Sequence, residues 1–474
     1  MKLGKFKIFV YLLILFSVLI TTAFGCKQKI SGKLAQKLQP ITLQYWRVWD
    51  GQDDFAPIIA AYNRVHPNVK IHYRKFRYSE YEEAITEAFA SDRAPDIISL
   101  HNTWMHEYQK KNFLAPMPAR TIMAYPEIAD SIKKEIVWKL KPNTSPSLAA
   151  IKKAFIGTVY DNIVIKSVDP KTKQAKENVY GLPLSVDTMA LFYNLDLFNN
   201  AGIINPPEYW NREFQEDVKK LTIQNNRGEI IQSGVALGGS DNINRSTDIL
   251  SLLMMQNGAE MTRGSNIAFH QAPTDFGDKG YNPGIDALRF YTDFANPAKE
   301  VYSWNDNLDS SLDMFVSNRL AMMFGYSYML LEIKSRAPKL NFEVVKLPQI
   351  EGNTLSMNYA NYWVEAVSRK SEHTEEAWDF IKHLAYNKKN VQSYLEATQK
   401  PPALRSLVEE MREEENALGV FSNQVLTAKS WYRGYDAETA EIAMKEMMDK
   451  VIKGQGSLNE IVEFAVRKMQ QTFK

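Results

Sequence analysis

Residues 41–100 read ITLQYWRVWDGQDDFAPIIAAYNRVHPNVKIHYRKFRYSEYEEAITEAFASDRAPDIISL, and this stretch decides the fold. Apolar side chains alternate over 41–45 and again over 69–73, which is the period of a strand with one buried face. The segments 55–62 and 81–89 instead carry apolar residues at the spacing of amphipathic helices. The run 95–100 then predicts a third, buried strand. The order strand–helix–strand–helix–strand predicts an α/β fold with a parallel sheet.

Aromatic and polar side chains follow the first and third of these predicted strands. In open α/β sheets, ligands bind beyond the carboxyl ends of the strands. The two strand ends therefore supply five candidate ligand-binding residues, which are Trp46, Trp49, Asp50, Asn102 and Trp104. The alternative is structural, because a tryptophan after a strand is often half buried. Neighbouring His101 is interpreted as a hydrogen-bonded structural residue.

Further along the chain, four segments follow in a recognisable order. They are GLPLSVDTMALFYNLDLFNNAGI (181–203), LAMMFGYSYMLLEIK (320–334), NYWVEAVSRKSEHTEEAWDFIKHLA (361–385) and KPPALRS (400–406). With YWRVWDG at 45–51 and APDII at 94–98, they make nearly all of 41–474 similar to the family 1 extracellular solute-binding proteins. That family includes the maltose- and other sugar-binding proteins of ABC importers. Each segment is a weak signal alone, and the resemblance rests on their order.

The resemblance implies a two-lobed, periplasmic-binding-protein-like clamshell of type II whose chain crosses the hinge three times. We expect the crossings near 183–189, 362–368 and 401–412. Lobe one would then comprise 41–183 plus 368–405, and lobe two 184–367 plus 406–474. The segment 119–180 is longer than the family requires, so we interpret it as an insertion on lobe one.

The resemblance also implies that the ligand lies between the lobes, in a cleft lined by aromatic side chains and a few polar groups. Asp187 stands at the first crossing, where the family places a ligand-contacting acid; its alternative role is that of a helix N-cap. Asn242, at the end of the glycine-rich loop 239–242, and Arg245 are weaker candidates. Capping of the next helix explains the neighbouring residues Ser240 and Asp241.

Aromatic candidates complete the predicted cleft. Tyr326 follows the predicted strand 320–324, with Tyr328 in reserve because strand alternation would point both the same way. Trp363 lies at the second crossing, where hinge packing is the alternative role. Trp431 is interpreted as core of lobe two, and lining of the cleft is its alternative role.

The first 26 residues have the organisation of a secretory leader. Lys2, Lys5 and Lys7 precede an apolar run over 8–19, and the only cysteine, Cys26, follows Gly25. The segment resembles a bacterial lipobox, although Phe24 is bulkier than the usual residue there. The resemblance implies a signal peptide over 1–25, lipidation of Cys26 and a tether over 26–40, with the protein on the outer face of the cytoplasmic membrane. The alternative is a membrane-spanning anchor with an unmodified cysteine, for which the apolar run is short.

Chain length predicts more than one domain, and the charge balance argues against nucleic-acid binding. The chain has 474 residues, so we expect two lobes or domains rather than a single ordinary core. Its net charge is +2, and because the three leader lysines carry +3, the remainder carries about −1. A neutral body of this kind has no electrostatic footprint for nucleic acid.

Signatures of catalysis are missing from the sequence: it contains no HExxH pair, no GxSxG elbow and no P-loop. The histidines show no metal-ligand spacing, so we expect no catalytic residue, no metal and no cofactor. The predicted function is a monomeric protein that binds a small solute, preferably a mono- or oligosaccharide, and delivers it to ABC permease subunits. Alternatives are a lipid-anchored glycoside hydrolase, or the same fold binding a peptide, a phosphate ester or a polyamine.

Overall fold

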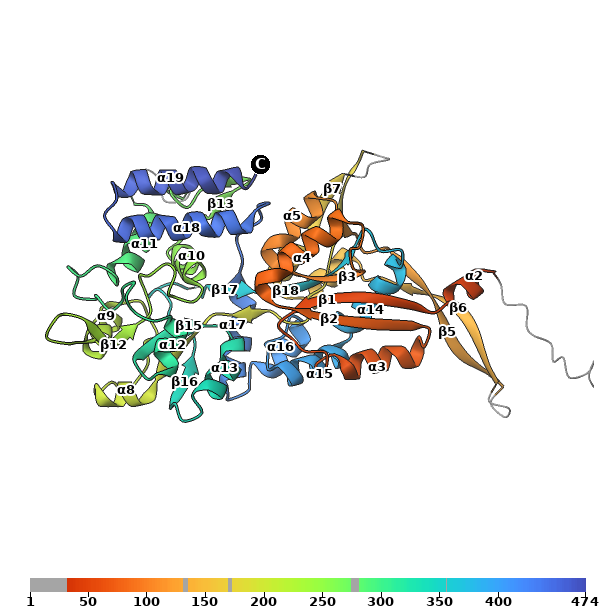
Figure 1. The fold of residues 1–474 in the computed structure, drawn as a ribbon, viewed down its shortest axis with the longest axis horizontal. Helices are drawn as coiled ribbons and strands as arrows, with labels where there is room; N and C mark the ends of the chain where they lie inside the picture. The colour runs from red at the N-terminus through yellow and green to blue at the C-terminus, as the bar shows by residue number, and fades with distance from the viewer. Residues whose placement is uncertain (1–31, 131–134, 169–172, 274–280, 355) are drawn as a thin grey trace, which may run out of the picture.

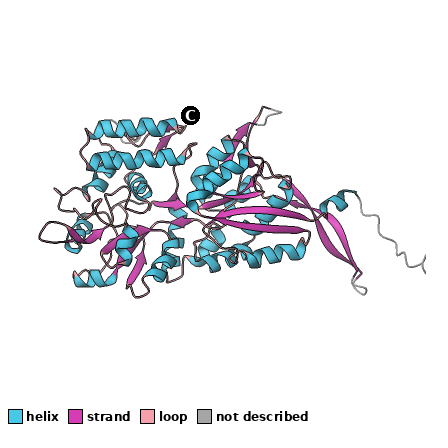
Figure 2. Cartoon of the chain, viewed as in Figure 1, coloured by secondary structure: helices cyan, strands magenta, loops and turns pink. Residues whose placement is uncertain are grey.

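Two five-stranded sheets, each with helices packed against it, form two lobes that lie side by side (Figures 1 and 2). The computed structural model describes residues 32–130, 135–168, 173–273, 281–354 and 356–474. Cys26 and the leader therefore lie outside the described residues. Within the described part of the chain, no helix combines the length and the apolarity needed to cross a bilayer.

The sheet of lobe one confirms the parallel arrangement predicted from residues 41–100. Strand β1 pairs in parallel with β2 on one side and with β3 on the other. Strand β18 comes from much later in the chain and pairs antiparallel with β3 and β4. The strand order is β2 (Val69–Phe76), β1 (Ile41–Val48), β3 (Ile97–His101), β18 (Trp363–Ser368) and β4 (Leu114–Ala115).

Helices from two distant parts of the chain complete lobe one. The first group is α3 (Ala56–Val65), α4 (Tyr78–Ala90), the 3-10 turn η1 (Asn102–Trp104) and α5 (Met105–Lys110). The second is α14 (Thr374–Ala385), α15 (Lys388–Thr398) and α16 (Arg405–Met411). The apolar face of α14 is fully buried against the core built by the first group. Helix α14 therefore completes a core to which residues about 300 positions earlier in the chain contribute.

Lobe two has its own core around a mixed sheet. Its strand order is β11 (Ile223–Gln224), β12 (Ile230–Val235), β15 (Leu320–Gly325), β10 (Ala190–Asn194) and β16 (Phe342–Val345). Its helices are α8 (Leu195–Asn200), α9 (Arg212–Leu221), α10 (Ser246–Gln256), α11 (Pro283–Asp293), α12 (Ser311–Val316), α13 (Tyr328–Arg336), α17 (Ala417–Gln424), α18 (Ala437–Ile452) and α19 (Leu458–Gln471). The turn η3 (Val425–Thr427) follows α17 and packs Val425 into the core of lobe one. The hairpin of β13 (Thr262–Arg263) and β14 (Asn266–Ile267) lies beside α19.

A sheet of three short strands lies between the two cores. Its order is β19 (Ala428–Lys429), β17 (Asn358–Asn361) and β9 (Asp187–Thr188), and each strand belongs to a segment that passes between the lobes. The first passage lies between Val186, in the core of lobe one, and Met189, in the core of lobe two.

The first predicted lobe boundary, at 183, lies too early, because Leu184 and Val186 are still in the core of lobe one. The other two predicted lobe boundaries are also wrong. Residues 363–367 were assigned to lobe two, but β18 begins at Trp363 and pairs with β3 along its length, so the second passage is β17 itself. Residues after 405 were also assigned to lobe two, but α16 packs Leu407 and Val408 into the core of lobe one. Both errors arise because the strand and the helix are defined by long-range partners that local sequence does not reveal.

The predicted insertion 119–180 consists of two hairpins separated by short helices. Strands β5 (Arg120–Asp130) and β6 (Glu135–Thr144) form a long ribbon that projects from lobe one (Figure 1). Helices α6 (Leu148–Ala154) and α7 (Gly157–Ile163) follow, and then the hairpin of β7 (Val164–Val168) and β8 (Ala175–Val179). The described part of the predicted tether forms helix α2 (Gly32–Lys37), which contacts β5 and β6.

Candidate functional site

A cleft of about 790 Å³ opens between the two lobes. On lobe one it is lined by α4 and by the residues that follow β3. On lobe two it is lined by the start of α10, by Trp431 and by α18, which faces α4 across the gap between the lobes (Figure 1). Because both lobes supply walls, a molecule bound here would contact both and would favour their approach.

Aromatic side chains from both lobes line this cleft. Trp104 is held with only 6% of its surface exposed, and its ring stacks on Tyr78 at 6.4 Å. On the opposite side lie Tyr359 of β17 and Trp431, whose indole N–H donates a 3.0 Å hydrogen bond to Ser251 Oγ. Rings fixed in this way offer flat apolar faces at little cost in conformational entropy.

A charged triad stands where α10 begins. Arg245 binds Asp248 through Nε at 2.8 Å and Nη2 at 2.9 Å, and the Tyr326 hydroxyl donates to Asp248 Oδ2 at 2.6 Å. Arg245 has φ of 58°, a left-handed conformation that costs free energy for a residue with a side chain. The paired carboxylate fixes the guanidinium at the cleft wall, and Asp248 is its only ion-pair partner among the described residues.

Carboxylates outnumber cations along the cleft. Glu82, Glu83 and Glu87 on α4 line one side, and Glu438 and Glu441 on α18 line the other. Burial, together with the nearby carboxylates Glu107 and Glu438, raises the pKa of Glu82 to about 7. Acids therefore face each other across the cleft, which disfavours an anionic ligand.

His101 lines the cleft in a neutral state. Its Nδ1 lies 2.7 Å from Thr103 Oγ1 and its Nε2 lies 3.2 Å from Asn361 Oδ1. Burial, reinforced by the positive charge of Arg245, lowers its pKa to about 4. The hydrogen bonds agree with the structural role predicted for His101. Within the described residues, no group of three or more His, Cys, Asp or Glu side chains is placed to hold a metal ion.

Trp49 and Tyr328, two of the predicted residues, meet across the lobes. Their rings stack at 6.3 Å, and Trp49 also stacks on Tyr78 at 5.5 Å. Tyr328 in turn stacks on Tyr326 at 6.1 Å. Trp49, Tyr328 and Tyr78 are 52%, 43% and 48% exposed, so a row of accessible rings joins lobe one to lobe two beside the cleft. Trp363 meets Trp104 edge-on at 5.5 Å and Tyr78 edge-on at 6.3 Å.

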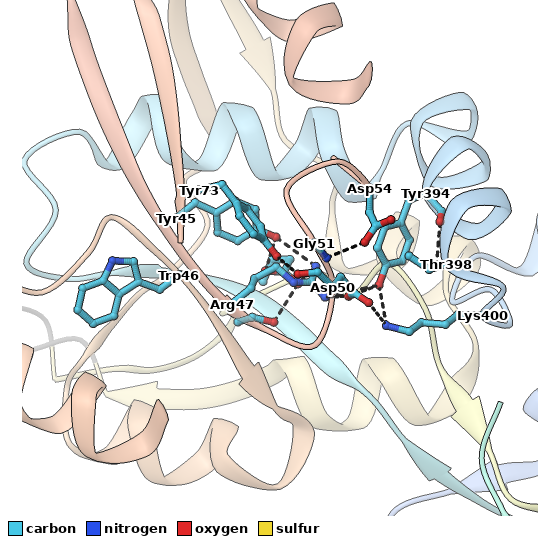
Figure 3. Close-up of polar contacts among 12 residues, drawn as sticks. Tyr45, Trp46, Arg47, Asp50, Gly51, Asp54, Tyr73, Tyr394, Thr398 and Lys400 are labelled. Carbon is cyan, nitrogen blue, oxygen red and sulfur yellow. Dashed lines mark hydrogen bonds and ion pairs between the residues drawn. The ribbon is translucent and has the colours of Figure 1, made fainter. Parts of the chain in front are cut away.

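Asp50 does not point to the cleft, which corrects its expected placement. It is 7% exposed and pairs with Arg47 Nη2 at 2.8 Å and with Lys400 (Figure 3). The Tyr394 hydroxyl donates to Asp50 Oδ2 at 2.8 Å. Burial opposes ionisation of Asp50, but the two cations keep its pKa below the usual value. The second carboxylate of this cluster, Glu365, forms an ion pair with Arg47 Nη1 at 2.9 Å.

Three other predicted residues are committed to structural contacts. Trp46 packs on Phe76 at 4.6 Å, and Asn102 donates to Ser430 Oγ at 2.7 Å. Asn242 donates to two backbone carbonyls and accepts from the Trp304 indole at 2.9 Å.

Asp187 is buried at the first passage. It accepts hydrogen bonds from the Ser327 amide at 3.1 Å and from the Ser327 hydroxyl at 2.7 Å, and it does not cap a helix. Burial raises its pKa to about 6, although these hydrogen bonds favour the charged form. Strand alternation does not relate Tyr326 to Tyr328, because β15 ends at Gly325 and a helix begins at Tyr328. Their rings stack, but Tyr326 is fully buried whereas Tyr328 is exposed.

Several cleft residues were missed or undervalued from the sequence. Tyr78 and Glu82 lie outside the buried face of a helix correctly predicted as amphipathic, and nothing local distinguishes them from solvated positions. Arg245 was only a weaker candidate, and Trp431, which packs against the core of lobe two as preferred, also lines the cleft as its alternative role predicted. An aromatic residue on the polar side of a helix was the one signal that could have identified Tyr78.

The profile of the bacterial extracellular solute-binding protein family matches residues 49–390. The galactooligosaccharide-binding protein of Bacillus subtilis (strain 168) is 23% identical over 411 residues, which cover 86% of this chain and 82% of that protein. A binding protein of Brucella abortus (strain 2308) is 26% identical over 211 residues, or 43% of this chain. The alignment spans 46% of that relative, so the chain matches about half of its length.

Solved structures share the fold. A cyclo/maltodextrin-binding protein in complex with maltotetraose superposes with a TM-score of 0.67 at 14% sequence identity. The superposition covers 92% of this chain and 98% of that one. At this identity the similarity establishes the two-lobed architecture.

Proposed function

Because this chain belongs to the bacterial extracellular solute-binding protein family, we propose that its inter-lobe cleft captures a saccharide and delivers it to the permease of an ABC importer. The observation that carries the proposal is a cleft of about 790 Å³ whose two walls come from different lobes and both present aromatic rings. Members of this family are binding proteins rather than enzymes.

The side chains in the cleft have the chemistry that sugars need. The C–H faces of a pyranose pack on rings such as Trp104 and Trp431. Its hydroxyls act as both donors and acceptors, so they can pair with carboxylates and with the guanidinium of Arg245. The B. subtilis relative is named for binding galactooligosaccharides, which supports a saccharide of similar chemistry here.

The charges in the cleft narrow the substrate class. Acids on α4 and α18 would repel uronates, sulfated sugars and phosphate esters. A neutral or amine-bearing saccharide is compatible with these carboxylates, because its hydroxyl or ammonium groups can donate hydrogen bonds to them.

The proposed function also includes attachment of the protein to the membrane through a lipid. Lipidation of Cys26 would hold the protein on the outer face of the cytoplasmic membrane, as the lipobox-like sequence before it predicts. We expect the protein to work as a monomer, since one chain supplies both walls of the cleft.

Thermal unfolding of the detergent-solubilised full chain tests this function. The panel is maltotetraose, mannobiose, a galactose tetrasaccharide, a glucosamine dimer, glucuronate, spermidine and a tripeptide. A ligand at about a hundred times its Kd adds about 2.7 kcal/mol, which raises the midpoint by several degrees. A shift with neutral or amino sugars, with the sugar recovered unchanged, supports the proposal. Cleavage of the sugar would indicate a hydrolase, and a shift confined to spermidine or the peptide would contradict the saccharide assignment.

A matched pair of tryptophan variants locates the site. Trp104→Ala removes a ring from the cleft and should weaken sugar affinity about 10-fold to 100-fold, the equivalent of about 1–3 kcal/mol. Trp46→Ala removes a ring that packs on Phe76 within lobe one and should leave affinity unchanged. Equal losses from both variants would show that the cleft is misassigned.

A further inference from the structure

The long hairpin of lobe one has one apolar face. In its antiparallel register Ile128 pairs with Ile136, Pro126 with Trp138, Ala124 with Leu140 and Ile122 with Pro142. Since side chains alternate along each strand, these eight residues share one face of the ribbon. We call them the even face.

The opposite face of the hairpin is attached to lobe one at its base. The Thr121 hydroxyl donates to Asp379 Oδ1 at 2.9 Å, and the Tyr125 ring meets His66 edge-on at 4.8 Å. Farther out, this face is ionic, because Glu127 bridges Lys139 and Lys141 at 2.6 Å each. The ribbon is therefore amphipathic along its projecting part, with charges on one face and aliphatic groups on the other.

The outer part of the even face is open. Ile128 is 70% exposed and Ile136 is 60% exposed, whereas Ala124 nearer the base is buried. Paired aliphatic side chains at this exposure on a two-stranded ribbon are unusual for a surface in contact only with water.

The hairpin lies beside the segment that leads to Cys26. Helix α2 contacts both strands, and Lys37 at its end pairs with Glu375 at 2.6 Å and with Glu376 at 2.7 Å, so α2 is docked on lobe one. Gly32 stands six positions after Cys26, a distance of at most about 20 Å in extended chain. Figure 1 shows α2 and the free end of the hairpin at the same end of lobe one, away from lobe two.

We infer that the even face of the β5–β6 hairpin rests on the bilayer that holds the lipid anchor. This inference depends on the proposed lipidation of Cys26. The anchor would keep the hairpin within reach of the membrane, aliphatic side chains such as Ile128 and Ile136 would enter the interface, and the ionic face would stay in water. Trp138, on the same face, suits the headgroup level. Contact at two points, the acyl chains and the hairpin, would fix the orientation of lobe one above the membrane.

Site-specific fluorescence in vesicles tests this contact. The full lipidated chain is reconstituted in phosphatidylethanolamine–phosphatidylglycerol vesicles after Ile128→Cys or Ile136→Cys and labelling with an environment-sensitive dye. Because Cys26 is the only natural cysteine and its sulfur carries the lipid, the introduced thiol is the only one that reacts. Ile204→Cys is the matched control, since Ile204 is 91% exposed and lies on lobe two. Both hairpin positions are exposed, so these substitutions should leave the unfolding midpoint unchanged.

The experiment distinguishes loss of the contact between hairpin and bilayer from loss of the lipid anchor. We expect brominated lipid to quench the dye at 128 and 136 at least twofold and to leave the dye at 204 unaffected. Vesicle-bound protein whose hairpin dyes are as unquenched as the control would overturn the bilayer contact and leave the anchor standing. A blue shift without quenching would also overturn it, since it would indicate a second protein copy on this face. Protein that fails to float with the vesicles would refute the anchor itself, and the bilayer contact with it.

Discussion

Replacing Asp50 by asparagine should destabilise lobe one without weakening saccharide binding. The Asp50 carboxylate is buried and balances two cations, Arg47 at 2.8 Å and Lys400, while Tyr394 donates to it at 2.8 Å (Figure 3). An asparagine of the same shape removes the negative charge and leaves one unbalanced cation in the cluster. Glu365 continues to pair with Arg47 at 2.9 Å, so the excess charge falls mainly on Lys400.

The free energy of unfolding that Asp50→Asn should lose can be estimated from these contacts. Breaking a buried ion pair by removing one partner costs about 3–5 kcal/mol. Lys400 retains 16% side-chain exposure and can partly regain water, which favours the lower end, about 3 kcal/mol. For a domain of about 150–250 residues this lowers the thermal midpoint by about 6–12 °C. Because the native pKa of Asp50 lies below 3.8, the stabilisation is present above that pH and is lost as the pH falls through the native pKa.

Two measurements on the same samples test this reasoning. Scanning calorimetry at pH 7 gives the midpoint, and isothermal titration with the sugar found in the panel gives the affinity. Asp53→Asn is the matched control, because Asp53 is exposed and three residues away and should change stability by less than about 0.5 kcal/mol. Adding Lys400→Met to Asp50→Asn should restore part of the loss by removing the excess cation. An unchanged midpoint with a tenfold loss of affinity would refute the structural role and place Asp50 at the ligand.

Three further changes test other parts of the structure. Glu82→Gln should raise the free energy of unfolding at pH 8 by about 1–2 kcal/mol, a value reduced for partial exposure. The native pKa of Glu82 is about 7 against 4.5 for a free side chain, so urea denaturation should show this gain shrinking as the pH falls from 7 to 4.5 and vanishing below. Tyr326→Phe should lower the free energy of unfolding by about 1–2 kcal/mol, because Asp248 loses a 2.6 Å hydrogen bond. An unchanged urea midpoint would show that this hydrogen bond does not contribute to stability. Gly181→Ala should cost about 1–3 kcal/mol in the same assay, since the added Cβ would lie 2.8 Å from the Glu365 carbonyl oxygen, and a neutral effect would mean that β18 can shift.

Local patterns in the sequence were enough to predict the architecture. The alternation over 41–45 and 69–73 and the buried run 95–100 correspond to β1, β2 and β3, which pair in parallel as expected. Such patterns are reliable because burial of one face imposes a period of two on strands and of 3.6 on helices, whatever the rest of the chain does. The order of motifs likewise identified the family that the profile confirms.

The site depended on contacts that no local pattern encodes. Asp50 follows a strand end as a ligand-binding acid would, yet Lys400 and Tyr394, about 350 positions later, take up its oxygens. Tyr78 sits on the solvent side of its helix and becomes a cleft residue only because lobe two stands opposite. The sequence by itself thus determined the elements and their class, since backbone hydrogen bonding and one-sided burial are local requirements. Only the tertiary structure decided which polar groups are paired and which remain free for a ligand, because that depends on which distant segments pack together.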